Sequence, residues 1–276
     1  MIAIEPYEYG KTVLKAENVR KSYGKDLVLK DLSVEIKDVH RKGYTQGQAV
    51  ALLGPSGVGK STFFRLLAGL EKPDSGTILV EQESVPVERG MVGVIAQNYP
   101  LFEHRTVMSN LKLAGTLGGR TGTKAQADAL DLLKRFGLAP QKDKYPTQLS
   151  GGQRQRVAII QQLLCSDHFL LFDEPFSGLD PIAEESVCAL IREMAQTDEL
   201  KTFVIVTHDI PAALAVCDTV WLLGRERDEA GNPIPGSSIQ KTYDLIQRGV
   251  AWRNGDRDTP EFAGVLREIR EAFNRL

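Results

Sequence analysis

The sequence lacks three features that mark special classes of protein: a long hydrophobic run, a cysteine framework and an excess of one charge. Its apolar runs, such as 49–53, 169–172 and 203–206, fall far short of the roughly 18–20 residues that a membrane-spanning helix needs. Residues 1–10 include Glu5 and Glu8 and have no apolar centre, so we expect no secretory signal.

Cysteine is scarce: Cys165, Cys188 and Cys217 are the three in 276 residues, and none forms a CxxC pair. This pattern disfavours a disulfide scaffold or a zinc ribbon and predicts reduced thiols inside a cytosolic protein. The 34 basic and 36 acidic side chains leave a formal charge of −2, whereas a dedicated nucleic-acid binder normally shows a basic excess. We therefore expect a cytoplasmic protein with no nucleic-acid partner.

The hydrophobic pattern indicates an α/β fold. After β-rich sequence over 13–53, short apolar runs at 77–80, 91–96, 169–172, 202–206 and 219–222 read as strands, and helices are expected near 63–70, 181–196 and 210–217. Such alternation favours a mostly parallel sheet covered on both faces. Helical spacing between 106 and 165 predicts an insertion into this domain. Residues 225–236 are polar with glycine and proline and are expected to be loop, and 260–276 a last helix.

A glycine-rich stretch between an apolar strand and a helix is the strongest single signal. It fits GxxxxGK[ST] over Gly54, Pro55, Ser56, Gly57, Val58, Gly59, Lys60, Ser61 and Thr62. Glycines let backbone N–H groups converge on phosphate oxygens, and the N-terminus of the following helix adds positive potential. Lys60 is expected to reach the β- and γ-phosphates of a nucleotide, and the Ser61 hydroxyl to hold Mg²⁺.

A pair of carboxylates ends the strand predicted at 169–172. Asp173 is expected to orient Mg²⁺, usually through water, and Glu174 to polarise the water that attacks the phosphate. Alone this signal is weak, because many strands end in an acidic residue at a solvated edge. Together with the phosphate loop it predicts nucleotide hydrolysis.

Between these two signals lies Leu149-Ser150-Gly151-Gly152-Gln153, and with it the sequence resembles the ATP-binding subunit of ABC-type transporters. The remaining landmarks follow in order along residues 13–224: Tyr23, Gln97, the run Ser177-Gly178-Leu179-Asp180, and His208. One departure is Gln161-Gln162, where members usually have Arg-Ala. A second is the lengthened hairpin segment 38–46, expected to be a solvated loop, with an added contact as the alternative.

The resemblance implies a P-loop NTPase (RecA-like) core with an antiparallel β subdomain and an inserted α-helical signature subdomain. It places an ABC ATPase domain at 12–224, with the helical subdomain at about 98–165, and an extension at 225–276. It also implies that the chain packs head to tail around ATP and Mg²⁺, either with a second copy or with a similar subunit. In that arrangement Ser150, Gly151, Gly152 and Gln153 face the γ-phosphate held by the other copy, and Asp180 lies at the dimer contact.

The same resemblance gives single residues their roles. His208 would contact the γ-phosphate and position Glu174, Tyr23 would stack on adenine, and Gln97 would touch Mg²⁺ and connect the site to the helical region. The loop at 97–105 joins the nucleotide core to the helical region and carries Tyr99, Leu101 and Phe102. Its position predicts that it docks a membrane subunit, with burial of these side chains in the helical region as the alternative.

The resemblance predicts an ATPase that powers solute transport from the cytoplasmic face of the membrane, as the subunit of an importer. Its permease would be a separate chain, served in turn by a solute-binding protein. The segment 257–263 is similar to the tails of nitrate-, sulfonate- and taurine-type import ATPases. The alternatives are a lipid-trafficking or export ABC ATPase and a non-transport soluble ABC ATPase.

Overall fold

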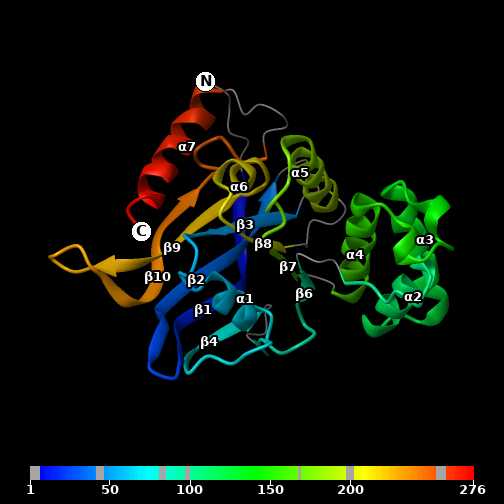
Figure 1. Ribbon diagram of the computed structural model, residues 1–276, viewed down its shortest axis with the longest axis horizontal. Helices are drawn as coiled ribbons and strands as arrows, with labels where there is room; N and C mark the ends of the chain where they lie inside the picture. Colours follow the sequence, from blue (N-terminus) through cyan, green and yellow to red (C-terminus); the bar gives the residue numbers. More distant parts are fainter. Residues whose placement is uncertain are drawn as a thin grey trace.

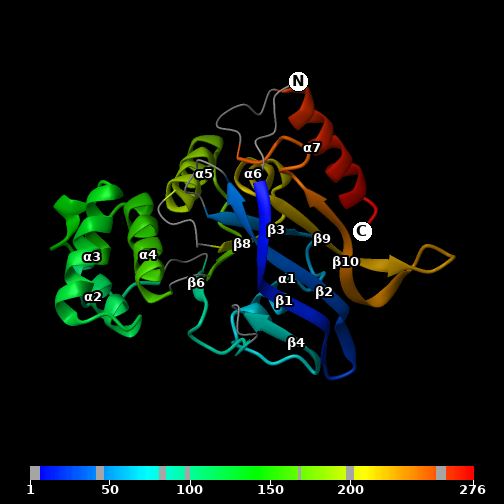
Figure 2. The ribbon, with the colours of Figure 1, turned by 180° about the vertical axis from the view of Figure 1, so that it is seen from behind.

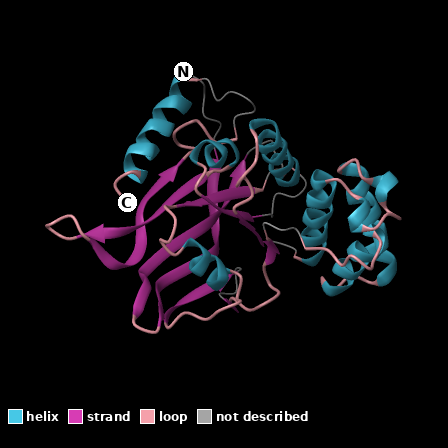
Figure 3. Cartoon of the chain, in the orientation of Figure 1, coloured by secondary structure: helices cyan, strands magenta, loops and turns pink. Residues whose placement is uncertain are grey.

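The chain is described as a computed structural model, covering residues 7–41, 47–80, 85–96, 100–166, 169–196, 202–252 and 259–276. Ten strands form one sheet in the order β5-β4-β1-β2-β10-β9-β3-β8-β7-β6. Figure 1 shows this sheet curling beneath helices, with a separate group of helices at one side. Figure 3 shows the same division, because that side group contains helices and loops and no strand among the described residues.

One half of the sheet is parallel. It comprises β9 (Thr219–Arg227), β3 (Gln48–Leu53), β8 (Thr202–Thr207), β7 (Phe169–Asp173) and β6 (Gly93–Ile95). All six residues of β3 and of β8 are buried, as expected for continuous apolar runs covered on both faces. This half ends its strands at a common edge, where the glycine-rich loop and the two carboxylates lie.

The other half is antiparallel. A long hairpin joins β1 (Tyr7–Tyr23) to β2 (Asp26–Arg41), and β4 (Ser75–Val80) and β5 (Val85–Pro86) extend it. Strand β10 (Pro233–Asp244) connects the halves, because it pairs antiparallel with β9 and parallel with β2. The expected combination of a P-loop core and an antiparallel β subdomain is confirmed.

The helices fall into two groups (Figures 1 and 2). In the side group, α2 (Val107–Leu117) packs on α3 (Gly122–Arg135) and α4 (Gly151–Cys165), with short turns η1 (Ala139–Gln141) and η2 (Pro146–Gln148) between them. The remaining helices accompany the sheet: α1 (Lys60–Leu67), α5 (Pro181–Ala195), α6 (Ile210–Val216) and α7 (Pro260–Phe273). No helix in the described ranges is both long and apolar enough to cross a membrane.

Two apolar clusters fill the two faces of the sheet. One packs α5, α6 and α7 against the alternate residues of β3 and β9 that include Ala51 and Leu222. The other encloses Phe63 of α1 between the parallel half and the curled hairpin, against Leu52 and Trp221. Because α1 is clamped between both halves, its N-terminus is a fixed point of the fold.

Two of the expected loops are partly strand. Strand β9 continues to Arg227 and β10 starts at Pro233, so within 225–236 the loop is confined to 228–232. Residues 38–41 likewise belong to β2, while 42–46 lie outside the described residues. Both predictions relied on polar composition. Whether a polar segment forms a strand depends instead on pairing with a neighbouring strand, as Ser238 pairs with Gly224 here. Gly224, the expected end of the ATPase domain, lies inside β9.

Candidate functional site

The glycine-rich loop joins β3 to α1 at the edge of the parallel sheet, directly after Leu53. Two glycines are required by the space around them. A Cβ on Gly54 would lie 2.6 Å from the carbonyl oxygen of Leu223, and one on Gly59 would lie 2.9 Å from Cγ1 of Val28. Gly59 also has φ of 101°, which side chains rarely allow. The loop therefore fits closely against β2 and β9.

Helix α1 begins at Lys60, three residues before the expected start, and ends at Leu67 instead of residue 70. Its first turn contains Lys60, Ser61 and Thr62, so the charged and hydroxyl groups stand at the positive end of the helix. Ser61 is exposed and Thr62 buried, and Ser56 and Gly57 at the top of the loop are exposed. These positions suit a phosphate approached from solvent.

The Lys60 side chain is enclosed by the loop that it follows. It is 8 % exposed, and its Nζ donates to the carbonyl oxygens of Gly54 at 2.8 Å and Pro55 at 3.2 Å. Oε1 of Glu174 lies 3.8 Å from the same nitrogen. Burial lowers the pKa of Lys60, and the charges of Glu174 and Asp173 oppose that shift.

Glu174 is held in an unusual backbone conformation at the end of β7. Its φ of 48° lies in the left-handed region, and its N–H donates to the carbonyl oxygen of Val206 at 2.8 Å. Oε2 lies 2.9 Å from Nδ1 of His208 and also accepts the backbone N–H of His208 at 3.3 Å. The two oxygens of one carboxylate thus face Lys60, at the start of α1, and His208, directly after β8. Left-handed residues other than glycine are uncommon and cluster at functional sites.

A magnesium ion fits the oxygen donors at this edge. Ser61 offers a hydroxyl and Asp173 a carboxylate. Burial raises the pKa of Asp173, and the neighbouring charge of Glu174 raises it further. In the described part of the chain no three His, Cys, Asp or Glu side chains gather into a metal cluster. Mg²⁺ is typically bound through one or two carboxylates together with substrate phosphates, so few protein ligands are needed to hold it. Gln97, the other expected ligand, lies outside the described residues.

The signature stretch, which is the run Leu149-Ser150-Gly151-Gly152-Gln153, lies at the start of α4 in the helical side group. Ser150 caps the helix by accepting the N–H of Gln153, whose side chain in turn accepts the N–H of Ser150. A Cβ on Gly151 or Gly152 would have nothing within 4 Å. Their small size is therefore not required by packing within this chain, in contrast to Gly54 and Gly59.

Two further expected site residues have visible structural partners. Asp180 caps α5, since its Oδ1 accepts the N–H groups of Ile182 and Ala183, both at 2.9 Å. Tyr23 ends β1, and its hydroxyl meets the side chains of Arg65 and Glu71. Sequence reasoning missed Arg65 and Glu71, because nothing in their spacing links them to a tyrosine that lies 42 and 48 residues earlier.

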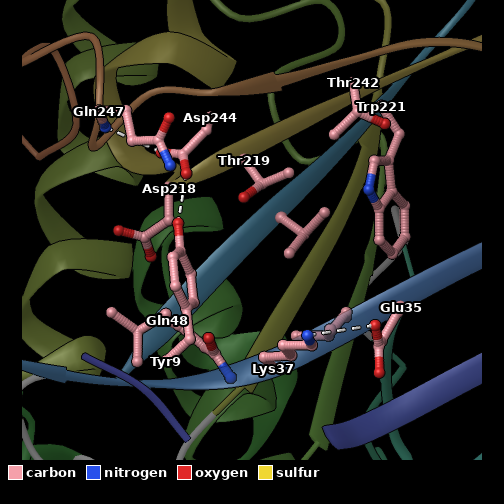
Figure 4. Close-up of a pocket in the computed structure, with 13 residues that line it drawn as sticks. Tyr9, Glu35, Lys37, Gln48, Asp218, Thr219, Trp221, Thr242, Asp244 and Gln247 are labelled. Carbon is pink, nitrogen blue, oxygen red and sulfur yellow. Dashed lines mark hydrogen bonds and ion pairs between the residues drawn. The ribbon is translucent and has the colours of Figure 1, made fainter. Parts of the chain in front are cut away.

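A pocket lies at the end of β3 that is opposite to the glycine-rich loop. This pocket of about 330 Å³ is lined by residues of β1, β2, β3, β9 and β10, among them Tyr9, Gln48 and Trp221 (Figure 4). Its two buried or half-buried carboxylates have partners in the chain: Asp218 accepts the N–H of Ala49 and Nε1–H of Trp252, and Asp244 accepts the Tyr9 hydroxyl. These contacts tie the first strand and the C-terminal part to the core, so we do not place the nucleotide site there.

Comparison with known proteins agrees with the geometry at the Lys60 edge, the edge of the parallel half of the sheet where Lys60, Asp173 and Glu174 lie. Residues 39–177 match the ABC transporter family model. The chain is 39 % identical over 230 residues to the arginine transport ATP-binding protein ArtM of Bacillus subtilis, covering 80 % of this chain and 92 % of ArtM. It is 40 % identical over 224 residues to the sulfate/thiosulfate import ATP-binding protein CysA of Gloeobacter violaceus, covering 79 % of this chain. It spans 62 % of the length of that CysA.

A solved structure extends the likeness to the fold. The protein cbiO1 from Clostridium perfringens, described as part of the ABC transporter complex cbiONQ, superposes with a TM-score of 0.71 at 26 % identity. The match covers 96 % of this chain and 97 % of cbiO1. Family match, relatives and fold agree with the phosphate loop, the paired carboxylates and the signature helix: this chain belongs to the ABC transporter family, as a nucleotide-binding ATPase subunit.

Proposed function

We propose that the chain binds ATP with Mg²⁺ at the Lys60 edge and that Glu174 is the general base for its hydrolysis. The observation that carries this proposal is the placement of the Glu174 carboxylate, 3.8 Å from Nζ of Lys60 and 2.9 Å from Nδ1 of His208. Lys60 marks where the phosphates lie, so a carboxylate beside it stands where the attacking water must be activated.

The chemistry follows from these positions. As the water oxygen bonds to the γ-phosphorus, Glu174 takes its proton, and the bond to the β–γ bridging oxygen breaks to leave ADP and phosphate. His208 holds the Glu174 carboxylate and faces the same phosphate, while Lys60 compensates the charge that develops on the leaving group. Mg²⁺, held by Ser61 and Asp173, would neutralise phosphate charge when bound.

A second copy would complete the site. Gly151 and Gly152 present an open helix N-terminus, which is suited to an anion, and they lie on α4 in the helical side group, whereas the glycine-rich loop leads into α1 at the sheet (Figure 1). Beside Asp180, Leu179 is 38 % and Ile182 81 % exposed, an apolar pair that a contact with another copy would cover. We therefore propose the head-to-tail dimer, with Ser150 and Gln153 of one copy facing the ATP of the other.

The loop before α2 is the proposed contact with a membrane permease. Phe102 is 47 % exposed, with the guanidinium of Arg105 5.8 Å from its ring centre. Buried Asn110 holds the loop by accepting the N–H of Phe102 and donating to the carbonyl oxygens of Phe102 and Arg105. Tyr99 lies outside the described residues, and Leu101 is half-buried. An exposed aromatic ring on a rigid loop is typical of an interface anchor.

The named relatives favour import as the direction of transport, since CysA and the Fe(3+) ions import protein FbpC of Agrobacterium fabrum are both import subunits. We propose that the chain works peripherally at the cytoplasmic face of the membrane. A solute-binding protein would serve the permease.

The test is Glu174→Gln, which keeps the shape of the side chain and removes its basic oxygen. Hydrolysis should fall by about 10²- to 10⁴-fold, the usual contribution of a positioned general base, while ATP binding survives. Light scattering with Mg-ATP should then detect a long-lived dimer. The matched control is Glu229→Gln, an exposed carboxyl in the 228–232 turn, which should hydrolyse at the parental rate. Parental hydrolysis by Glu174→Gln would exclude Glu174 as the base, and ATP binding without any dimer would contradict the proposed head-to-tail dimer.

A further inference from the structure

Tyr23 combines a hydroxyl group that is hydrogen-bonded to neighbouring side chains with a side chain that is partly exposed to solvent. The residue ends β1, and its strand partner Asp26 follows a two-residue turn in which Gly24 has φ of 61°. Tyr23 is 42 % exposed. Its hydroxyl donates to Oε2 of Glu71 and accepts from Nη2 of Arg65 at 3.0 Å. The polar end of the ring is therefore fixed while much of the side chain remains accessible.

The two fastening groups form an ion pair of their own. Nε of Arg65 donates to Oε1 of Glu71, so each side chain contacts both the other and the tyrosine. The Tyr23 hydrogen bond, followed by the contact with Arg65, lowers the pKa of Glu71, which therefore stays ionised at neutral pH. A charged acceptor and a charged donor bind one hydroxyl more strongly than neutral groups would.

This cluster is physically joined to the phosphate loop. Arg65 lies on α1, the helix that begins with Lys60, and its Nη2 is 3.5 Å from Oγ1 of Thr62 in the first turn. From the β1 side, Nζ of Lys21 lies 5.6 Å from the centre of the Tyr23 ring and donates to the carbonyl oxygen of Lys72 at 2.8 Å. The ring is thus held between the tip of the hairpin and α1.

We infer that Arg65 and Glu71 are positioning residues that preorganise Tyr23 as a platform for the nucleotide base. The inference deepens the proposed ATP site and rests on it. A side chain that is already ordered before binding saves the entropy of ordering it, which corresponds to about two- to tenfold in affinity per side chain. Because the platform and Lys60 are connected through α1, base and phosphates are bound in one fixed geometry.

The experiment compares two ligands that differ by the base and the sugar: Mg-ATP and magnesium tripolyphosphate. Dissociation constants are measured by calorimetry for Tyr23→Phe, which keeps the ring and removes the hydroxyl, and for Glu71→Gln, which removes the charge of the acceptor. Each variant should raise the dissociation constant of ATP about two- to tenfold and leave the dissociation constant of tripolyphosphate unchanged. Tyr23→Ala should weaken ATP further, because it also removes the stacking surface.

Two controls separate positioning from damage to the fold. Asp31→Asn breaks the exposed ion pair with Arg20 in the same hairpin, at 3.1 Å, and should bind both ligands like the parent. In the double variant Tyr23→Phe/Glu71→Gln the two losses should not add, because both remove the same contact.

The outcomes separate this inference from the proposed site. If Tyr23→Ala weakens ATP but Tyr23→Phe and Glu71→Gln do not, the platform stands and the fastening role of Glu71 is overturned. If Glu71→Gln weakens the binding of tripolyphosphate as much as the binding of ATP, the substitution acts through the fold of α1, and the inference fails. If even Tyr23→Ala leaves ATP affinity unchanged, base stacking at Tyr23 is itself wrong, while the Glu174→Gln test of hydrolysis is unaffected.

Discussion

Replacing Gly152 by alanine tests whether a second molecule approaches the start of α4. Gly152 is the second residue of the helix, is exposed, and has no atom within 4 Å of the position that a Cβ would take. Within one chain the substitution therefore creates no clash. Alanine is the better helix former by at most about 1 kcal/mol, and less in a first turn, so the free energy of unfolding should stay the same or rise slightly.

The expected loss lies in the dimer. If the γ-phosphate held by another copy packs against this glycine, a methyl group must be forced into a close contact. Overpacking of that kind costs about 1–3 kcal/mol, which corresponds to a fall of about 5- to 150-fold in ATP-driven dimerisation and hydrolysis. Nucleotide affinity of the single chain should not change, because the Lys60 loop is untouched.

Gly264→Ala is the matched control. Gly264 is also an exposed helical glycine with nothing within 4 Å of its Cβ position, but it lies on α7. Both variants are compared by denaturant unfolding, by ATP binding and by ATPase rate over a range of protein concentrations. Gly264→Ala should match the parent in rate. A parental ATPase rate for Gly152→Ala would refute the close approach, and a large loss of stability would show that the open space around the glycine was misjudged.

The remaining predictions concern separate parts of the chain. Lys60→Ala should abolish ATP binding or hydrolysis, because the phosphates lose their ammonium partner, and near-parental turnover at saturating Mg-ATP would contradict the phosphate-loop assignment. Phe102→Asp should lose the co-purifying permease and keep basal hydrolysis, and retention of the permease would exclude docking through this loop. Burial raises the pKa of the Cys217 thiol, so at pH 8 Cys217 should carry less thiolate than a free cysteine and react slowly with iodoacetamide until the chain is unfolded. Rapid labelling of Cys217 in the folded protein would contradict its burial.

Local patterns made the nucleotide-binding part of the fold predictable. Residues 48–53, the glycine-rich loop and the helix after it are contiguous, so one pattern specified a strand, a phosphate cradle and Lys60 together. Strand β7, which ends in Asp173 and is followed by Glu174, could be predicted for the same reason, since an apolar run of strand length ended in charge. The end of β9 at 225–227 and the start of β10 could not, because these polar segments depend on pairing with each other across the sheet.

The sequence by itself determined which chemistry the chain carries, because short motifs fix their own backbone and the residue types that it presents. It could not determine which groups meet across the fold. Glu174 and His208 share a hydrogen bond across 34 positions, and Tyr23 is reached by Arg65 from α1 and by Glu71 from the loop after that helix. Such contacts arise when parallel strands end at one edge and when a hairpin tip packs on α1. The left-handed φ of Glu174 is likewise a product of tertiary structure, held by the hydrogen bond to Val206 on the neighbouring strand and by the contacts of its carboxylate. These geometries depend on the relative placement of distant segments, which only the packed sheet decides.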